Sequence, residues 1–103
     1  MVKEIAEIEV TPGHEQAFEA AVKEAAPLFE RAPGCRALKL ERVIEDPTKY
    51  RLVVMWDTVR HHMEYFRASP AFQEWRRLAS PHWAGTPSVH HTEMVVDGFG
   101  FPL

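Results

Sequence analysis

Six histidines are the side chains of this 103-residue chain that could most directly bind a metal or move a proton. They include two adjacent pairs, His61-His62 and His90-His91. Neighbours on a helix point about 100° apart and neighbours on a strand face opposite sides of a sheet, so neither pair can chelate one ion. The sequence also lacks H-x-x-x-H, H-E-x-x-H and a cysteine pair. These spacings predict no built-in metal site, and most of the histidines are expected at the surface or at a dimer edge.

Two other kinds of site find little support in the sequence. Cys35 is the single cysteine, and a nucleophilic thiol needs a neighbouring base and a lowered pKa. No such base can be assigned from sequence, so a half-buried structural thiol is expected. The five glycines do not form G-x-G-x-x-G, the loop that binds nucleotide phosphates. We therefore expect no nucleotide cofactor.

A group of aromatic and apolar side chains is more informative. Their periods assign them to the inner faces of a strand and of helices, where such residues usually only pack a core. The group comprises Leu52, Trp56, Phe66, Phe72 and Trp75. His62 and Arg76 stand at helical spacings near this group and could reach inward. Since a buried arginine requires an acidic partner or an anionic ligand, the group is either a plain core or the wall of a pocket.

The elements that must position these residues follow from the hydrophobic periods of the chain. Alternation predicts strands at 2–10, 35–44, 50–56 and 88–96, and apolar stripes predict helices at 14–31, 58–66 and 70–79. Thr11 is expected to cap the first helix, and Pro27 to kink or end it near Ala26. Asp57 or Thr58 is expected to cap the next helix, and Ser69, followed by Pro70, the last.

This order is β-α-β-β-α-β, with the second helix broken in two. It predicts one α+β domain of the ferredoxin-like type over 1–103, with a tail at 97–103, in which a four-stranded antiparallel sheet carries its helices on one face. Strand 50–56 has Arg51 as its only charged residue, so both of its faces are expected to be buried. A second copy of the chain is the simplest cover for the open face. Val53, Met55 and either Val96 or Met94 would then fill a homodimer interface.

Charge and hydropathy narrow the possible partners and the location. The net charge is −3, which implies no basic face for nucleic acid. The first ten residues include four charged side chains and no apolar segment of signal-peptide length. No apolar run approaches the roughly 20 residues of a membrane span. A protein of the cytoplasm, without nucleic-acid or membrane partners, is the simplest expectation.

Four short segments, taken together in their order, resemble the antibiotic biosynthesis monooxygenase superfamily of dimeric α+β barrel proteins. They are Ala32-Pro33-Gly34-Cys35, Val54-Met55-Trp56, Ser69-Pro70-Ala71-Phe72 and Val89-His90-His91. The resemblance runs from residue 2 to about residue 96. It implies a homodimer whose sheets pack face to face, with a pocket in each subunit between sheet and helices. It also implies oxidation of phenols or quinols with molecular oxygen, without a metal or a flavin, as in the best-understood enzymes of the superfamily.

Residue by residue, the resemblance carries over in part. A characterised member has a tryptophan where Trp56 stands and an arginine where Arg76 stands, and both positions match. Its pocket tyrosine corresponds to His62 and its pocket asparagine to Leu52. In the haem-degrading branch the iron-binding histidine aligns near Arg76, so the ligand is missing and haem degradation is rejected unless His62 or His82 substitutes for it.

The first hypothesis is therefore a cofactor-independent monooxygenase acting on a phenolic or quinol-like aromatic molecule. Trp56 would form a pocket wall, Arg76 would stabilise a substrate oxyanion, and His62 would act as acid or base. The alternative is a non-enzymatic dimer of the same fold that binds a small aromatic ligand or serves as a stress-related accessory protein. Phe66, Phe72 and Trp75 would then close its pocket. A third class is an isomerase or decarboxylase that uses a histidine to move a proton.

Overall fold

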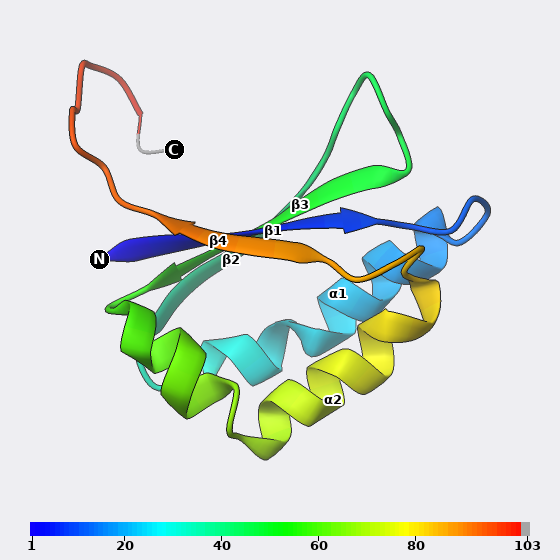
Figure 1. The fold of residues 1–103 in the computed structure, drawn as a ribbon, viewed down its shortest axis with the longest axis horizontal. Coiled ribbons are helices and arrows are strands. Elements are labelled where there is room, and N and C mark those ends of the chain that lie inside the picture. Colours follow the sequence, from blue (N-terminus) through cyan, green and yellow to red (C-terminus); the bar gives the residue numbers. More distant parts are fainter. Residues whose placement is uncertain (102–103) are drawn as a thin grey trace.

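The computed structural model describes residues 1–101. Its strands are β1 (Val2–Glu9), β2 (Cys35–Arg42), β3 (Lys49–Trp56) and β4 (Ser88–Thr92). Its helices are α1 (Glu15–Glu30), the π-helical segment η1 (His61–Phe66), α2 (Pro70–Ala79) and the short 3₁₀ turn η2 (Ser80–His82). The strands pair antiparallel in the order β2-β3-β1-β4, and the helices lie on one face of the sheet (Figure 1). The predicted ferredoxin-like α+β fold is confirmed.

The core lies between the sheet and the helices, because alternate residues of the central strands point that way. On β3 these are Tyr50, Leu52, Val54 and Trp56, each no more than 1% exposed. The buried stripe of α1 covers them with Phe18, Ala21, Val22, Ala25 and Phe29. Trp75 of α2 packs edge-on against Phe29 at a ring-centroid distance of 5.3 Å. The hydrophobic periods of the sequence thus assemble one continuous core.

Helix α1 differs from the prediction at both ends. Thr11 does not cap it: the backbone N–H of His14 donates to the Thr11 carbonyl, and the turn passes through Gly13 at φ +93°. The helix therefore begins at Glu15, without a side-chain cap. Pro27 does not end it near Ala26, because the helix continues to Glu30. Pro27 is exposed and close to the C-terminus, so its missing N–H removes a single bond from the last turns.

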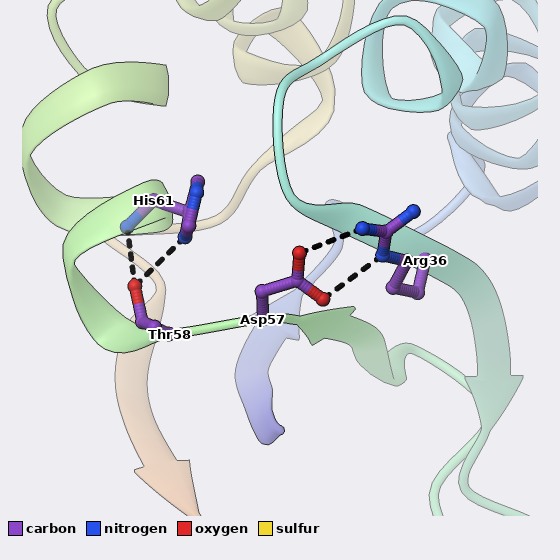
Figure 2. A network of polar contacts seen from close by, with 4 residues as sticks. All are labelled: Arg36, Asp57, Thr58 and His61. Atoms are coloured by element: carbon purple, nitrogen blue, oxygen red, sulfur yellow. Dashed lines mark hydrogen bonds and ion pairs between the residues drawn. The ribbon is translucent and has the colours of Figure 1, made fainter.

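The break in the second helical region is built from side-chain caps. Thr58 Oγ1 accepts from the backbone N–H of His61, whereas Asp57 pairs with Arg36 at 2.9 and 2.7 Å (Figure 2). Of the two expected candidates, Thr58 is the one whose side chain caps the helical backbone, which begins at Val59, two residues before η1. Ser69 Oγ accepts from the N–H of Phe72 as predicted, with Pro70 as the first residue of α2. These caps hold η1 and α2 as two separate pieces over the sheet.

The last strand is shorter than predicted, because β4 ends at Thr92 rather than at residue 96. Thr92 pairs with Lys3, and β1 itself begins at Val2, so the partner strand runs out at this point. Met94, Val95 and Val96 are exposed beyond the sheet, and the chain leaves it there (Figure 1). Residues 102–103 of the predicted tail lie outside the described residues.

The sheet face opposite the helices carries apolar side chains from its two central strands. Ile5 of β1 pairs with Val53 of β3, and Lys3 pairs with Met55. Val53 and Met55 are partly exposed. Strand β3 is thus buried on its helix side and partly exposed on the other side. Within one chain, only one of the two faces that were expected to be buried is fully buried. Among residues 1–101, no helix is both long and apolar enough to cross a membrane.

Candidate functional site

A cavity of about 130 Å³ lies between the helix side of the sheet, the helices η1 and α2, and the loop before β4. The sheet contributes Glu4, Ala6, Ile8, Leu52 and Val89 to its lining. The helices and loops contribute His62, Arg67, Phe72, Trp75, Arg76, Trp83, Thr86 and Pro87. The cavity therefore has mainly apolar walls and a few polar groups, as ligand sites generally do.

Five of the seven predicted site residues line this cavity, namely Leu52, His62, Phe72, Trp75 and Arg76. The structure differs from the prediction for the other two. Trp56 and Phe66 are 0% and 3% exposed and pack against each other behind the lining, with ring centroids 5.3 Å apart. They belong to the core because residue 56 lies at the end of β3, beneath η1. Trp56 reaches the site through its indole N–H rather than as a wall.

A buried polar cluster forms the inner part of the site. Trp56 Nε1 donates to Glu4 Oε1 at 2.9 Å, and His62 Nε2 lies 3.3 Å from the same oxygen. The other ring nitrogen of His62, Nδ1, lies 2.8 Å from His91 Nε2. The His62 ring also stacks on Trp56, with centroids 5.3 Å apart and planes 19° from parallel. Glu4 and His62 are the two buried polar or charged residues of the described chain, at 5% and 4% exposed.

Burial sets the protonation of this cluster. Desolvation raises the pKa of Glu4 from 4.5 to about 7, against the hydrogen bond from Trp56 and the charge of Arg67, which lower it. Desolvation also lowers the pKa of His62 from 6.5 to about 4, helped by the nearby His91 and Arg67. At neutral pH His62 is therefore a neutral imidazole and Glu4 is divided between acid and carboxylate. A group that titrates near the working pH suits general acid–base catalysis.

The sheet register brings the cluster together. Antiparallel pairing sets Glu4 of β1 opposite His91 of β4 and opposite Val54 of β3, so all three side chains share the helix face. His90 points to the other face, as the neighbour rule predicts. Sequence reasoning missed Glu4, although strand parity gives it the same face as Ala6 and Ile8. It also missed the contact of His91 with His62, which depends on how strands distant in sequence pair.

Arg76 lines the cavity but is exposed rather than buried. Its guanidinium carbon lies 6.0 Å from the centroid of the Phe72 ring. Two glutamates of the helical region bind other arginines instead, because Glu64 pairs with Arg60 and Glu74 with Arg77. Arg76 and Arg67 thus place positive charge beside the cavity.

Trp83 brings a second indole N–H group, after that of Trp56, and sequence reasoning did not identify it. Its indole Nε1 is buried and has no hydrogen-bond partner in the described part of the chain, and the residue lines the cavity. Buried donors are usually paired, so an unpaired one beside the cavity is unusual. Within residues 1–101 no group of three or more His, Cys, Asp or Glu side chains is arranged to hold a metal ion.

Comparisons with known proteins agree with this architecture. Residues 1–78 match the family described as antibiotic biosynthesis monooxygenase. The chain is 37% identical to the uncharacterized protein YczJ of Bacillus subtilis over 95 residues, which cover 92% of this chain and 100% of YczJ. A crystal structure from Bordetella bronchiseptica, whose name assigns it provisionally to the same family, is 52% identical with a TM-score of 0.91, covering 92% of this chain and 97% of that one. A similarly named protein from Nitrosomonas europaea shares the fold at 18% identity, with a TM-score of 0.79 and coverage of 93% and 100%.

Proposed function

We propose, because this chain belongs to the antibiotic biosynthesis monooxygenase family, that it is a cofactor-independent monooxygenase oxidising a small phenolic or quinol-like aromatic molecule with O₂. The observation that carries this proposal is the cavity with a buried acid–base pair, Glu4 and His62, among its lining residues. An aromatic substrate would contact the apolar walls while its hydroxyl group meets this pair. We also propose that the protein acts in the cytoplasm.

The proposed reaction needs the protein mainly for proton transfer. The Glu4 carboxylate takes a proton from the substrate, and the resulting electron-rich anion passes one electron to O₂. The substrate radical and superoxide combine into a carbon–oxygen bond, and the peroxide takes up a proton. Loss of a second substrate proton and cleavage of the O–O bond then give a carbonyl product and water. In total the substrate loses two hydrogen atoms and gains one oxygen atom, a four-electron oxidation that balances the four-electron reduction of O₂ to the carbonyl oxygen and water.

Two cationic groups support the anionic stages. Arg76 and Arg67 line the cavity, and their positive charge favours a phenolate over a phenol. Trp83 also lines the cavity, so its side chain can contact the substrate. His62, neutral at pH 7, is the acid or base beside Glu4.

The size of the cavity favours a substrate with a single ring. Its volume of about 130 Å³ is close to that of an engineered protein cavity of about 150 Å³ that holds benzene. Pockets for larger molecules measure roughly 300–1,000 Å³. A single-ring hydroquinone therefore matches the volume of the cavity, whereas a tricyclic anthrone would extend beyond it.

The proposed partner is a second copy of the chain, bound through the open sheet face. Val53 and Met55 present apolar surface there, and exposed Met94 and Val96 follow the last strand. Burying this surface would add to the core that a chain of 103 residues can form alone.

Oxygen consumption tests the proposed activity. The purified protein is incubated with a panel of substituted hydroquinones and anthrones in an oxygen electrode, with E4Q as the matched variant. The expected result is substrate-dependent oxygen uptake that falls by about 100-fold in E4Q, the usual range for loss of a general base. Absence of turnover with every compound would contradict the monooxygenase proposal.

The alternative is a non-enzymatic dimer that binds a small aromatic molecule. One observation favours it: Leu52 lines the cavity where a characterised enzyme has an amide, so one polar group is missing. This alternative predicts saturable binding of an aromatic compound, measured by calorimetry, without oxygen uptake.

A further inference from the structure

Glu4, His62 and His91 form a continuous line of close polar contacts from the cavity to the edge of the sheet. Glu4 lines the cavity, and its Oε1 lies 3.3 Å from His62 Nε2. His62 Nδ1 lies 2.8 Å from His91 Nε2. His91 belongs to β4, which is an outer strand of the sheet, and it is partly exposed. The line therefore connects a buried site to a residue in contact with water.

The middle of the line is the best-fixed part. His62 is buried, its ring stacks on Trp56, and its two nitrogens face Glu4 and His91. An imidazole can accept a proton at one nitrogen while it releases a proton from the other. Trp56 donates to the same Glu4 oxygen that faces His62, which fixes the carboxyl group as well. A residue needed only to fill space would not require this arrangement of donors and acceptors.

We propose that Glu4, His62 and His91 are a proton relay between the cavity and solvent. This inference rests on the proposed function, because the monooxygenase reaction first releases a proton from the substrate and later returns one to the peroxide. Glu4 is then the group that meets the substrate, and His62 and His91 act through it.

The transfers balance without any other reactant. The Glu4 carboxylate takes a proton from the substrate and passes it to Nε2 of His62. His62 releases the proton on its Nδ1 to Nε2 of His91, which gives its Nδ1 proton to water. Each imidazole ends in its other tautomer. The return of a proton from water to the peroxide runs the same steps backwards and restores both tautomers.

The surrounding charges are few and favour neutral histidines. Arg67, beyond the end of η1, acts on Glu4, His62 and His91, and lowers the pKa of each. His90, the neighbour on β4, also lowers the pKa of His91, although burial is the larger cause. The hydrogen bond from Trp56 of β3 lowers the pKa of Glu4, in opposition to burial. Arg76 of α2 adds positive charge at the cavity.

The first arm of the test needs no substrate. Ring-nitrogen NMR shifts of ¹⁵N-labelled protein are followed from pH 5 to pH 9 in the unmodified chain, in E4Q and in H90Q. In the unmodified protein the ring-nitrogen shifts of both His62 and His91 are expected to change together, in one step, at the pH where Glu4 gains or loses its proton. That step should vanish in E4Q and persist in H90Q, because His90 faces the other side of the sheet. Independent titration of His91, unchanged in E4Q, would overturn the relay.

The second arm uses turnover and compares H91Q with H90Q. H91Q is expected to lower kcat by about tenfold, below the roughly 10²–10⁴-fold attributed to a general acid or base itself. KM should stay constant, and added imidazole should restore kcat, which a purely structural defect would not allow. H90Q, which removes the influence of His90 on the pKa of His91 but no member of the relay, should keep most of the kcat of the unmodified protein. Equal kcat in H91Q and H90Q would overturn the relay, whereas absence of any turnover would contradict the proposed function and leave the relay to be judged by NMR.

Discussion

At the scale of single residues, the site depends on a carboxyl group that the fold removes from water. Glu4 is 5% exposed, and among residues 1–101 Trp56 Nε1 and His62 Nε2 lie against its Oε1. Such a group ties the stability of the protein to pH, because the folded and unfolded states bind its proton with different strength.

Substitution of Glu4 by glutamine makes this link measurable. In the folded protein the pKa of Glu4 is raised to about 7 from 4.5, so its contribution to stability is full below pH 4.5 and is lost as pH rises through 7. The lowered pKa of His62 acts in the opposite sense, with stability lost as pH falls from 6.5 towards 4. As pH rises from 4.5 to 8, the free energy of unfolding of E4Q should therefore increase by up to about 3 kcal/mol relative to that of the unmodified protein.

Urea unfolding at pH 5 and pH 8 measures this difference. Glu7→Gln is the matched control, because Glu7 is exposed on the other face of β1. The same pH dependence in E4Q and the unmodified protein would show that burial does not raise the pKa of Glu4.

Arg76 and Arg77 provide a second matched pair at this scale. Arg76 lines the cavity, whereas Arg77 pairs with Glu74. R76Q should lower kcat/KM by about tenfold, less than the roughly 10²–10³-fold of an enclosed oxyanion donor, because water screens its exposed guanidinium. R77Q should leave kcat/KM unchanged. Oxygen uptake measures both, and equal values for the two variants would remove Arg76 from the site.

At the scale of elements, the start of η1 depends on a close approach to Gly34. This glycine has φ +79°, and a β-carbon built on it would collide with the imidazole ring of His61. His61 is held there by Thr58 Oγ1, 2.8 Å from its Nδ1 (Figure 2). The next residue is His62, so the same contact supports the candidate site.

Gly34→Ala should therefore destabilise the protein more than Gly13→Ala. Both residues have positive φ, which costs alanine roughly 1–2 kcal/mol, but nothing lies within 4 Å of a β-carbon at Gly13. G34A must also displace His61 and its hydrogen bond, a further loss of about 1 kcal/mol. Urea unfolding of the two variants compares them directly. Equal free energies of unfolding for the two variants would mean that His61 can move away from residue 34 without any loss of stability.

The elements also show what sequence reasoning reaches and what it does not. The alternation of residues 50–56 predicted β3, and the apolar stripe of Phe18, Val22 and Phe29 predicted α1. Both predictions were possible because the spacing of buried residues within a segment depends on that segment alone. The end of β4 was misplaced, because it is decided by where β1 begins. The π-helical turn of η1 has no such pattern in the sequence, so the sequence could not decide whether His62 points inward. The contact of His62 with His91 was not predicted, because it also depends on how distant strands pair.

At the scale of the whole molecule, the two faces of the sheet serve different purposes. One holds the core and the candidate site, and the other presents Val53 and Met55. A charge placed in the middle of that open face should therefore prevent pairing of two chains while leaving the core unchanged.

Val53→Lys tests the proposed homodimer. The unmodified protein is expected to sediment as a dimer and V53K as a monomer in analytical ultracentrifugation, since two buried ammonium groups would face an apolar surface. Val59→Lys, an exposed valine just before η1, is the control and should remain dimeric. A monomeric unmodified protein would contradict the proposed interface.

The bond between Trp56 and Glu4 also gives the molecule a built-in optical reporter. The emission of an indole depends on the electric field around it, and here the field changes when a neighbouring carboxyl group gains or loses a proton. A ligand that alters the charge on Glu4 should shift this emission even if no reaction follows. Candidate molecules could be screened by fluorescence, without a label and before any substrate is known, with Trp56→Phe as the reference that reports Trp75 and Trp83 alone.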